Sequence, residues 1–198
     1  SEHRTAREKA SWLLMAEIKK LKQTKQLKNS GSVVIFEERA EGSILSNFAN
    51  YNNGLVTGDY PRFGRKYWEL NKRNDDWEFQ QSTVNETRMF GGMESIIHWS
   101  KGCGDLYDFL VDRLGLHGIT AWLRGREVWG LKGICVRGMT TLPISAYLGN
   151  VFDNNVTVIT PNSKEYLAVI WTYCASERYS QDVRSVNSKM SVTDGSFL

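Results

Sequence analysis

The stretch "KGICVRGMTTLPISAYLGNVFDNNVTVIT", residues 132–160, contains three short β-rich runs: "KGICVRGM" (132–139), "LPISAYL" (142–148) and "NVTVIT" (155–160). Valine, isoleucine, threonine and tyrosine are typical of strands, and the glycines and asparagines between the runs are typical of turns. Connections this short join antiparallel neighbours, because parallel strands need a longer crossover. The stretch therefore predicts the centre of a mainly antiparallel sheet.

The chain before this stretch mixes further β-rich runs with one helix. The pattern "GDLYDFLVDRLGLHG" (104–118) predicts a helix with Asp105 near its start and Gly115 at its end. The region "ANYNNGLVTGDYPRF" (49–63) is rich in turn residues. The β-rich or alternating runs are "SVVIFEE" (32–38), "KYWEL" (66–70), "DWEFQQSTV" (76–84) and "ITAWLRG" (119–125).

Helical patterns mark both ends of the chain. Residues 4–28 predict one helix with an apolar stripe, ended by "NSGS" (29–32). Two helices are predicted within residues 160–176 and 177–190, where apolar residues recur at helical spacing. The expected fold is α+β, a mixed α/β domain over residues 31–198 with a mainly antiparallel sheet and a C-terminal helix pair, preceded by a connecting helix over residues 1–30. The apolar positions that define these helices are Ala10, Leu13, Leu14, Ile18, Leu21, Leu167, Ile170, Trp171, Cys174, Tyr179, Val183 and Val186.

Composition and the spacing of cysteine and histidine exclude several classes of protein. Of the 198 residues, 41% are hydrophobic and 24% are charged, as in an ordinary soluble domain. No run of about 18 apolar residues is present, so no membrane span is expected. The three cysteines are scattered, which favours the reducing cytoplasm. The three histidines have no partners at the spacing of zinc ligands, so no metal site is predicted.

The charge of the chain is unevenly distributed. Residues 1–30 contain eight Lys or Arg and three acidic residues, a balance of +5, whereas residues 31–198 contain 17 basic and 19 acidic residues, a balance of −2. The overall charge is therefore not that of a typical nucleic-acid binder, and any basic binding surface must be local.

Sequence motifs of catalysis and cofactor binding are absent. The three prolines are not adjacent, so the Asn/Asp-Pro-Pro-aromatic motif of amino-methyltransferases is missing. No GxGxxG fingerprint, GxxxxGK[ST] loop or GxSxG elbow occurs, and no pattern typical of a nuclease is found. The sequence predicts no catalytic residue and no cofactor bound by this chain.

Two clusters of basic and aromatic residues are candidates for contact with nucleic acid. In "GLVTGDYPRFGRKYWEL" (54–70), three cations alternate with aromatic residues after a Thr-Gly-Asp turn. In "AWLRGREVWGLKGICVRG" (121–138), four cations alternate with glycine and tryptophan. Cations bind phosphates, Arg reads guanine, and Asn or Gln reads adenine. The candidate DNA-binding residues are Thr57, Arg62, Arg65, Lys66, Gln80, Gln81, Arg124, Arg126, Lys132, Arg137, Asn154 and Asn155.

Each of these residues also has a structural interpretation. The turn at residues 57–59 can be an ordinary surface turn, with the nearby aromatics in the core. The amides of Gln80, Gln81, Asn154 and Asn155 can serve turns or strand surfaces. The lysine-rich end of the first predicted helix can simply face water.

Residues 54–69, "GLVTGDYPRFGRKYWE", resemble the "G-L-x-T-G-D-x-x-R-F-x-R-x-x-W-E" stretch of large bacterial adenine-specific DNA methyltransferases. These enzymes belong to restriction–modification and related phage-defence systems. Residues 80–99 and 123–198 resemble the part of the same proteins that follows the catalytic domain, where the target recognition domain lies. The ending "SVTDGSFL" (191–198) is similar in pattern to recognition domains of type I specificity subunits.

The resemblance implies a DNA target recognition domain whose catalytic partner is elsewhere. In that family an upstream domain carries S-adenosylmethionine and the Asn-Pro-Pro-Tyr motif, and this chain shows neither. The expected partners are double-stranded DNA and the catalytic domain of the same parent protein, to which residues 4–28 would connect. The resemblance gives no target sequence. Two other functions stay open, a carbohydrate-binding module that uses Trp and Tyr as stacking platforms and a protein-interaction domain.

Overall fold

The computed structural model describes residues 5–18, 20–27, 34, 44–192 and 197. The chain divides into two units, residues 1–40 and 41–198, whereas the sequence predicts a boundary at residue 30. The predicted strand over residues 32–38 lies outside the described residues, except for Val34.

The described residues of the first unit form two short helices, α1 (Ala6–Met15) and α2 (Gln23–Gln26). A capping box between Thr5 and Glu8 starts α1, and Ala16 ends it in extended backbone. The prediction of one helix over residues 4–28 is therefore wrong. Its apolar stripe is exposed, with 89% of Leu14 accessible to solvent, and short helices without a packing partner are marginal.

The first sheet of the second unit has the strand order β1-β8-β5-β6 and is entirely antiparallel. Its core strands are those of the opening stretch, with Cys135 opposite Val158 and Ser145. The strand at the other edge falls in the region predicted as turns, where its residues pair with β8. The strands are β1 (Ala49–Asn53), β5 (Gly133–Arg137), β6 (Ile144–Tyr147) and β8 (Val156–Pro161).

The second sheet has the order β2-β4-β3-β7. Its pairs are antiparallel except for β3 and β7, which run parallel over two residue pairs. The expected α+β class with mainly antiparallel sheets is confirmed. The strands are β2 (Gly64–Lys66), β3 (Trp77–Gln81), β4 (Ser95–His98) and β7 (Val151–Phe152).

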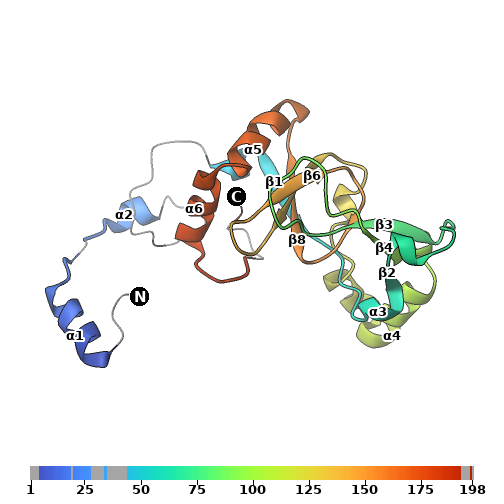
Figure 1. The fold of residues 1–198 in the computed structure, drawn as a ribbon, viewed down its shortest axis with the longest axis horizontal. Coiled ribbons are helices and arrows are strands. Elements are labelled where there is room, and N and C mark those ends of the chain that lie inside the picture. The colour runs from blue at the N-terminus through green and yellow to red at the C-terminus, as the bar shows by residue number, and fades with distance from the viewer. Residues whose placement is uncertain (1–4, 19, 28–33, 35–43, 193–196, 198) are drawn as a thin grey trace. The chain divides into compact units, whose positions relative to one another are not determined.

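The predicted C-terminal helix pair covers the first sheet, and we call this assembly the first lobe (Figure 1). The helices are α5 (Leu167–Cys174) and α6 (Glu177–Val186), and the Ser176 side chain caps the start of α6. Ile170, Cys174, Tyr179 and Val183 are buried in one cluster with the sheet residues Ile134, Val136, Ile144 and Ile159. The apolar spacing that predicted these helices therefore identifies their packed faces.

The second sheet packs with α3 (Tyr60–Phe63) and α4 (Asp105–Gly118) to form the second lobe (Figure 1). Leu106 and Leu110 of α4 are buried against Phe63 and Ile97. Gly115 has a φ of 71°, which interrupts the helix where the sequence predicts its end.

Short 3₁₀ turns replace two of the predicted β-rich runs. Tyr67–Glu69 and Ile119–Ala121 are 3₁₀ turns, so the strand interpretation of residues 66–70 and 119–125 is wrong there. Alternation alone does not distinguish a strand from such a turn. In the part of the chain that the structure describes, the other 3₁₀ turns are Leu45–Asn47, Ser100–Gly102, Arg126–Val128 and Lys164–Tyr166.

Candidate nucleic-acid interface

The Thr-Gly-Asp turn positions the first basic cluster. The Asp59 carboxylate accepts a hydrogen bond from the Arg62 backbone N–H at 3.3 Å and caps α3. Gly58 has a φ of 70°, and a Cβ on it would lie 2.2 Å from a Trp122 ring carbon. Glycine is therefore required at position 58, both by the backbone conformation and by the indole against it. The turn shapes the surface and presents Arg62.

Arginine guanidinium groups and aromatic rings alternate across the second lobe. Arg62 Cζ lies 4.8 Å from the Phe63 ring centre and 5.3 Å from that of Phe109. Arg113 Cζ lies 5.9 Å from the Phe109 ring centre and 5.3 Å from that of Trp122. We call Arg62, Phe63, Phe109, Arg113 and Trp122 the arginine–aromatic band. It joins α3, α4 and the segment after Ile119–Ala121.

The two arginines of the band are exposed and carry uncompensated charge. Within the described residues, neither has a carboxylate within ion-pairing distance. Rings hold a guanidinium by cation–π attraction while its N–H donors stay available to an anion. The exposed carboxylates of Asp108 and Asp112 lie on the same helix, α4, and would disfavour a polyanion on their side of it.

Arg126 forms a second, smaller cluster with two tryptophans. Its Cζ lies 5.7 Å from the Trp99 ring centre and 6.0 Å from that of Trp129. The two indoles meet edge to face at 5.2 Å. The neighbouring Glu127 accepts a hydrogen bond from Asn52 at 2.5 Å, which fixes the turn to β1.

The remaining candidates of the first basic cluster have local partners. Arg65 donates from one terminal nitrogen to the carbonyl oxygens of Pro61 and Gly64. The Lys66 ammonium lies 3.1 Å from Glu94 in an exposed ion pair. Thr57 is buried and belongs to the structure of the turn.

The second predicted cluster is not brought together in one place. Arg124 is half-buried, and no described residue accepts a hydrogen bond from its buried Nε. Lys132 is exposed. Arg137 belongs to β5 of the first lobe and donates to Asn85 at 2.9 Å. Only Arg126 is part of a cation–ring cluster among the described residues of this group.

The candidate amides fall into a buried pair and an exposed pair. Gln80 and Gln81 are each 1% exposed, so in this structure neither can reach a base edge. Gln81 Nε2 instead donates to the Ala146 carbonyl at 2.8 Å and links the two sheets. Asn154 and Asn155 are exposed in the turn between β7 and β8, where the Asn155 side chain hydrogen-bonds Asp153.

The sequence reasoning missed Arg113. Phe109 and Arg113 are four residues apart on a predicted helix, so their side chains lie on the same face. This i, i+4 spacing indicates a contact between Phe109 and Arg113. The long-range contact of Arg113 with Trp122 had no local signal.

Searches for metal sites and for similar proteins add no further assignment. Among the described residues, no group of three or more His, Cys, Asp or Glu side chains is placed to hold a metal ion. None of the helices in the described part of the chain is long and apolar enough to cross a membrane. No family model matches the chain, and no curated protein matches it significantly.

Proposed function

We propose that this chain recognises double-stranded DNA, as the target recognition domain of an adenine-specific DNA methyltransferase. The observation that supports this proposal is the arginine–aromatic band. Its two exposed guanidinium groups lie on rings with no carboxylate partner in the described residues, as a phosphate-binding surface requires. The sequence resemblance of residues 54–69 supplies the class of protein.

The proposal gives the cations different roles. Arg62 and Arg113 contact backbone phosphates, which contributes affinity for all sequences alike. Arg126, held between Trp99 and Trp129, is the candidate reader of a base edge, together with the exposed Asn154 and Asn155. A bidentate contact between Arg and guanine contributes about 1–3 kcal/mol of discrimination.

Methyl transfer is assigned to a separate catalytic domain under this proposal. That domain would bind S-adenosylmethionine and receive the flipped adenine. The unit of residues 1–40, whose first 30 residues have a balance of +5, would connect the two domains. The site of action would be the cytoplasm, where the DNA lies.

Selection of random DNA duplexes on the purified chain at two salt concentrations tests the proposal. We expect an enriched motif and an affinity that falls steeply as salt rises. Arg126→Ala should relax the preference at one position of the motif. Arg178→Ala is the matched control, because Arg178 is an exposed arginine of α6 outside the band. Absence of binding at both salt concentrations would refute DNA recognition by this chain.

A protein-interaction function is the second candidate, favoured by the apolar residues exposed in the first unit. Leu13, Leu14 and Ile18 are 66%, 89% and 84% exposed. Apolar side chains this exposed are typical of a segment that binds a protein surface. This function predicts a partner whose binding is insensitive to Arg62→Ala and is lost on Leu14→Asp.

A further inference from the structure

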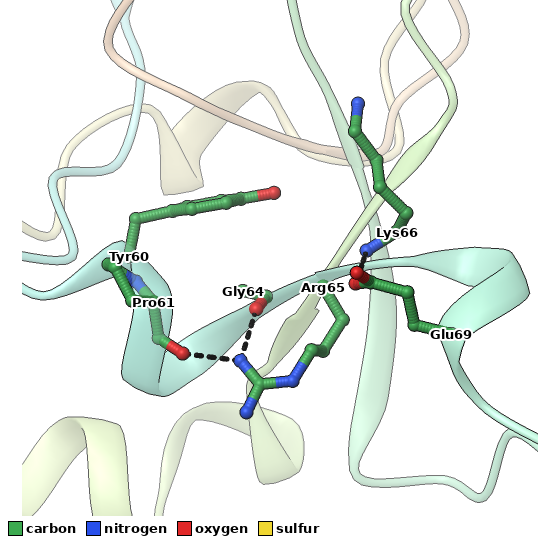
Figure 2. A pocket seen from close by; sticks show the side chains of 6 residues that line it. All are labelled: Tyr60, Pro61, Gly64, Arg65, Lys66 and Glu69. Atoms are coloured by element: carbon green, nitrogen blue, oxygen red, sulfur yellow. Dashed lines mark hydrogen bonds between the residues drawn. The ribbon is translucent and has the colours of Figure 1, made fainter.

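The second lobe carries a pocket beside the band, formed by a single segment of α3, β2 and the turn that follows. Its volume is about 330 Å³, which is within the range of small-ligand sites. Figure 2 shows the Tyr60 ring on one side of the pocket, and Lys66 and Glu69 on the other. The lining residues are Tyr60, Pro61, Gly64, Arg65, Lys66 and Glu69.

The aromatic wall of the pocket is fixed by Gly64. A Cβ on Gly64 would lie 2.3 Å from a Tyr60 ring carbon, so the ring rests directly on the glycine backbone. Tyr60 is nevertheless 40% exposed, which leaves part of its side chain accessible. A fixed, accessible aromatic ring is a platform for a flat, conjugated group such as a nucleobase.

The floor of the pocket carries a cation with no acidic partner in the described residues. One terminal nitrogen of Arg65 is held by the Pro61 and Gly64 carbonyls, as Figure 2 shows. A guanidinium has five N–H donors, so others remain for an anion. The Lys66 ammonium points away from the Arg65 guanidinium in Figure 2 and lies beside Glu94 and over the Trp68 ring. Arg65 is therefore the cation that matches a phosphate.

The remaining wall supplies an acceptor. Glu69 Oε2 accepts a hydrogen bond from the Lys66 backbone N–H at 2.6 Å, which orients the carboxylate. No described residue donates a hydrogen bond to the other oxygen, Oε1. An exposed carboxylate oxygen accepts from an amino group, as adenine, cytosine and guanine provide and thymine does not.

We infer that this pocket binds one unpaired nucleotide, with its base on Tyr60, its phosphate at Arg65, and the amino group of its base at Glu69. The nucleotide comes from a DNA strand or is free in solution. The strand source rests on the proposed DNA recognition, whereas the free source does not.

Fluorescence anisotropy with labelled DNA tests the strand source. The probes are a blunt duplex and the same duplex with one extrahelical adenine. We expect the duplex with the extrahelical adenine to bind about tenfold more tightly, because one base-stacking contact contributes a free energy of about that size. Tyr60→Ala should remove that difference and Tyr60→Phe should keep it. Glu69→Gln, a surface change that leaves the ring in place, should weaken the preference for extrahelical adenine over thymine.

Calorimetric titration with dAMP and dTMP tests the free source. Binding of dAMP that Tyr60→Ala abolishes, without a preference for the extrahelical duplex, would assign the pocket to free nucleotides. Equal affinity for both duplexes, together with no binding of dAMP, would refute nucleotide binding in the pocket and would leave the proposed DNA recognition standing. Arg62 lies in the band, so Arg62→Ala should weaken the binding of both duplexes alike and leave the ratio of their affinities unchanged. Loss of all duplex and nucleotide binding in the unmodified chain would overturn both proposals.

Discussion

The two lobes use their cations and aromatic residues differently. In the first lobe, Arg178 pairs with Asp182 at 3.6 Å, and Arg184 donates to the Thr140 carbonyl at 2.9 Å. In the second lobe, Arg62 and Arg113 lie over aromatic rings. All cation–ring contacts found among the described residues fall between residues 62 and 129. The two arginines of the first lobe are held by oxygen acceptors, whereas Arg62 and Arg113 of the second lobe keep N–H donors for a ligand.

The largest expected effect concerns the core of the first lobe. Ile159→Ala removes a fully buried side chain between β8 and the helix pair, so we expect a loss of about 2–5 kcal/mol in the free energy of unfolding. Denaturant unfolding monitored by circular dichroism measures it. Val169→Ala, on α5 but 68% exposed, is the control and should change stability by less than about 0.5 kcal/mol. Equal losses in both variants would contradict the assigned core.

The second prediction separates backbone strain from contact in the second lobe. Gly58 and Gly115 have φ values of 70° and 71°, but a Cβ on Gly58 meets Trp122, whereas one on Gly115 has nothing within 4 Å. Gly115→Ala should cost about 1–3 kcal/mol, because a φ of 71° with a ψ of 163° lies in a region that is essentially restricted to glycine. Gly58→Ala should cost that amount and about 1–3 kcal/mol more for the clash.

Thermal or denaturant unfolding of both variants checks this difference. The Trp122→Ala background should recover part of the cost of Gly58→Ala, because it removes the ring that the new methyl group meets. Identical costs for the two glycine variants would mean that the indole does not hold the turn.

The two lobes also differ in how far the sequence predicts them. In the first lobe, β-rich runs locate β5, β6 and β8, and apolar residues at helical spacing locate α5 and α6. The sequence predicts these elements because the apolar residues that define them are the residues buried in the core. In the second lobe, residues 67–70 and 119–125 fold as 3₁₀ turns or irregular backbone despite their β-rich composition. Their conformation depends on contacts between distant residues, which composition does not encode.

The candidate site shows the same limit. The segment 54–70 was identified from its cations and aromatics, and Arg62 does lie on aromatic rings. The amides of Gln80 and Gln81 have the chemistry of base readers, but both side chains are buried, and that of Gln81 packs against Ser145 and Ala146 of the other sheet. Trp122 was seen as an aromatic of the second cluster, and only the fold places it beside Gly58 and Arg113. Residue type indicated the chemistry, and tertiary structure decided which residues can perform it.

The third prediction tests whether the free donors of the second lobe bind phosphate. The double variant Arg62→Ala and Arg113→Ala should reduce the slope of log affinity against log salt by about 2, because each phosphate contact contributes about 0.9. Stability should fall by only about 1–2 kcal/mol, because each of the two exposed guanidinium groups contributes about 0.5–1 kcal/mol by cation–π attraction. Arg178→Ala in the first lobe should leave the slope unchanged. Equal salt slopes for the band variant and this control would mean that the band does not contact DNA phosphates.

The smallest expected effect lies at Asp153, where the two lobes meet. Its carboxylate accepts hydrogen bonds from Ser82 Oγ at 2.6 Å and from the Asn155 backbone N–H at 2.9 Å. Burial raises the pKa of Asp153 above its ordinary value of 3.8, although these hydrogen bonds oppose the rise. The folded protein therefore binds a proton more readily at Asp153 than the unfolded chain does.

The sign of the pH effect follows from that difference. Above the folded pKa of Asp153, the buried charge costs stability, and the cost is relieved as pH falls through the folded pKa towards 3.8. Asp153→Asn keeps an acceptor for Ser82 and removes the charge. The free energy of unfolding of Asp153→Asn should therefore change less with pH in this window than that of the unmodified protein. Denaturant unfolding at a series of pH values measures this difference. The opposite result would be that the unmodified protein loses more stability than Asp153→Asn as pH falls through this window. That result would mean that the folded protein stabilises the Asp153 carboxylate as an anion.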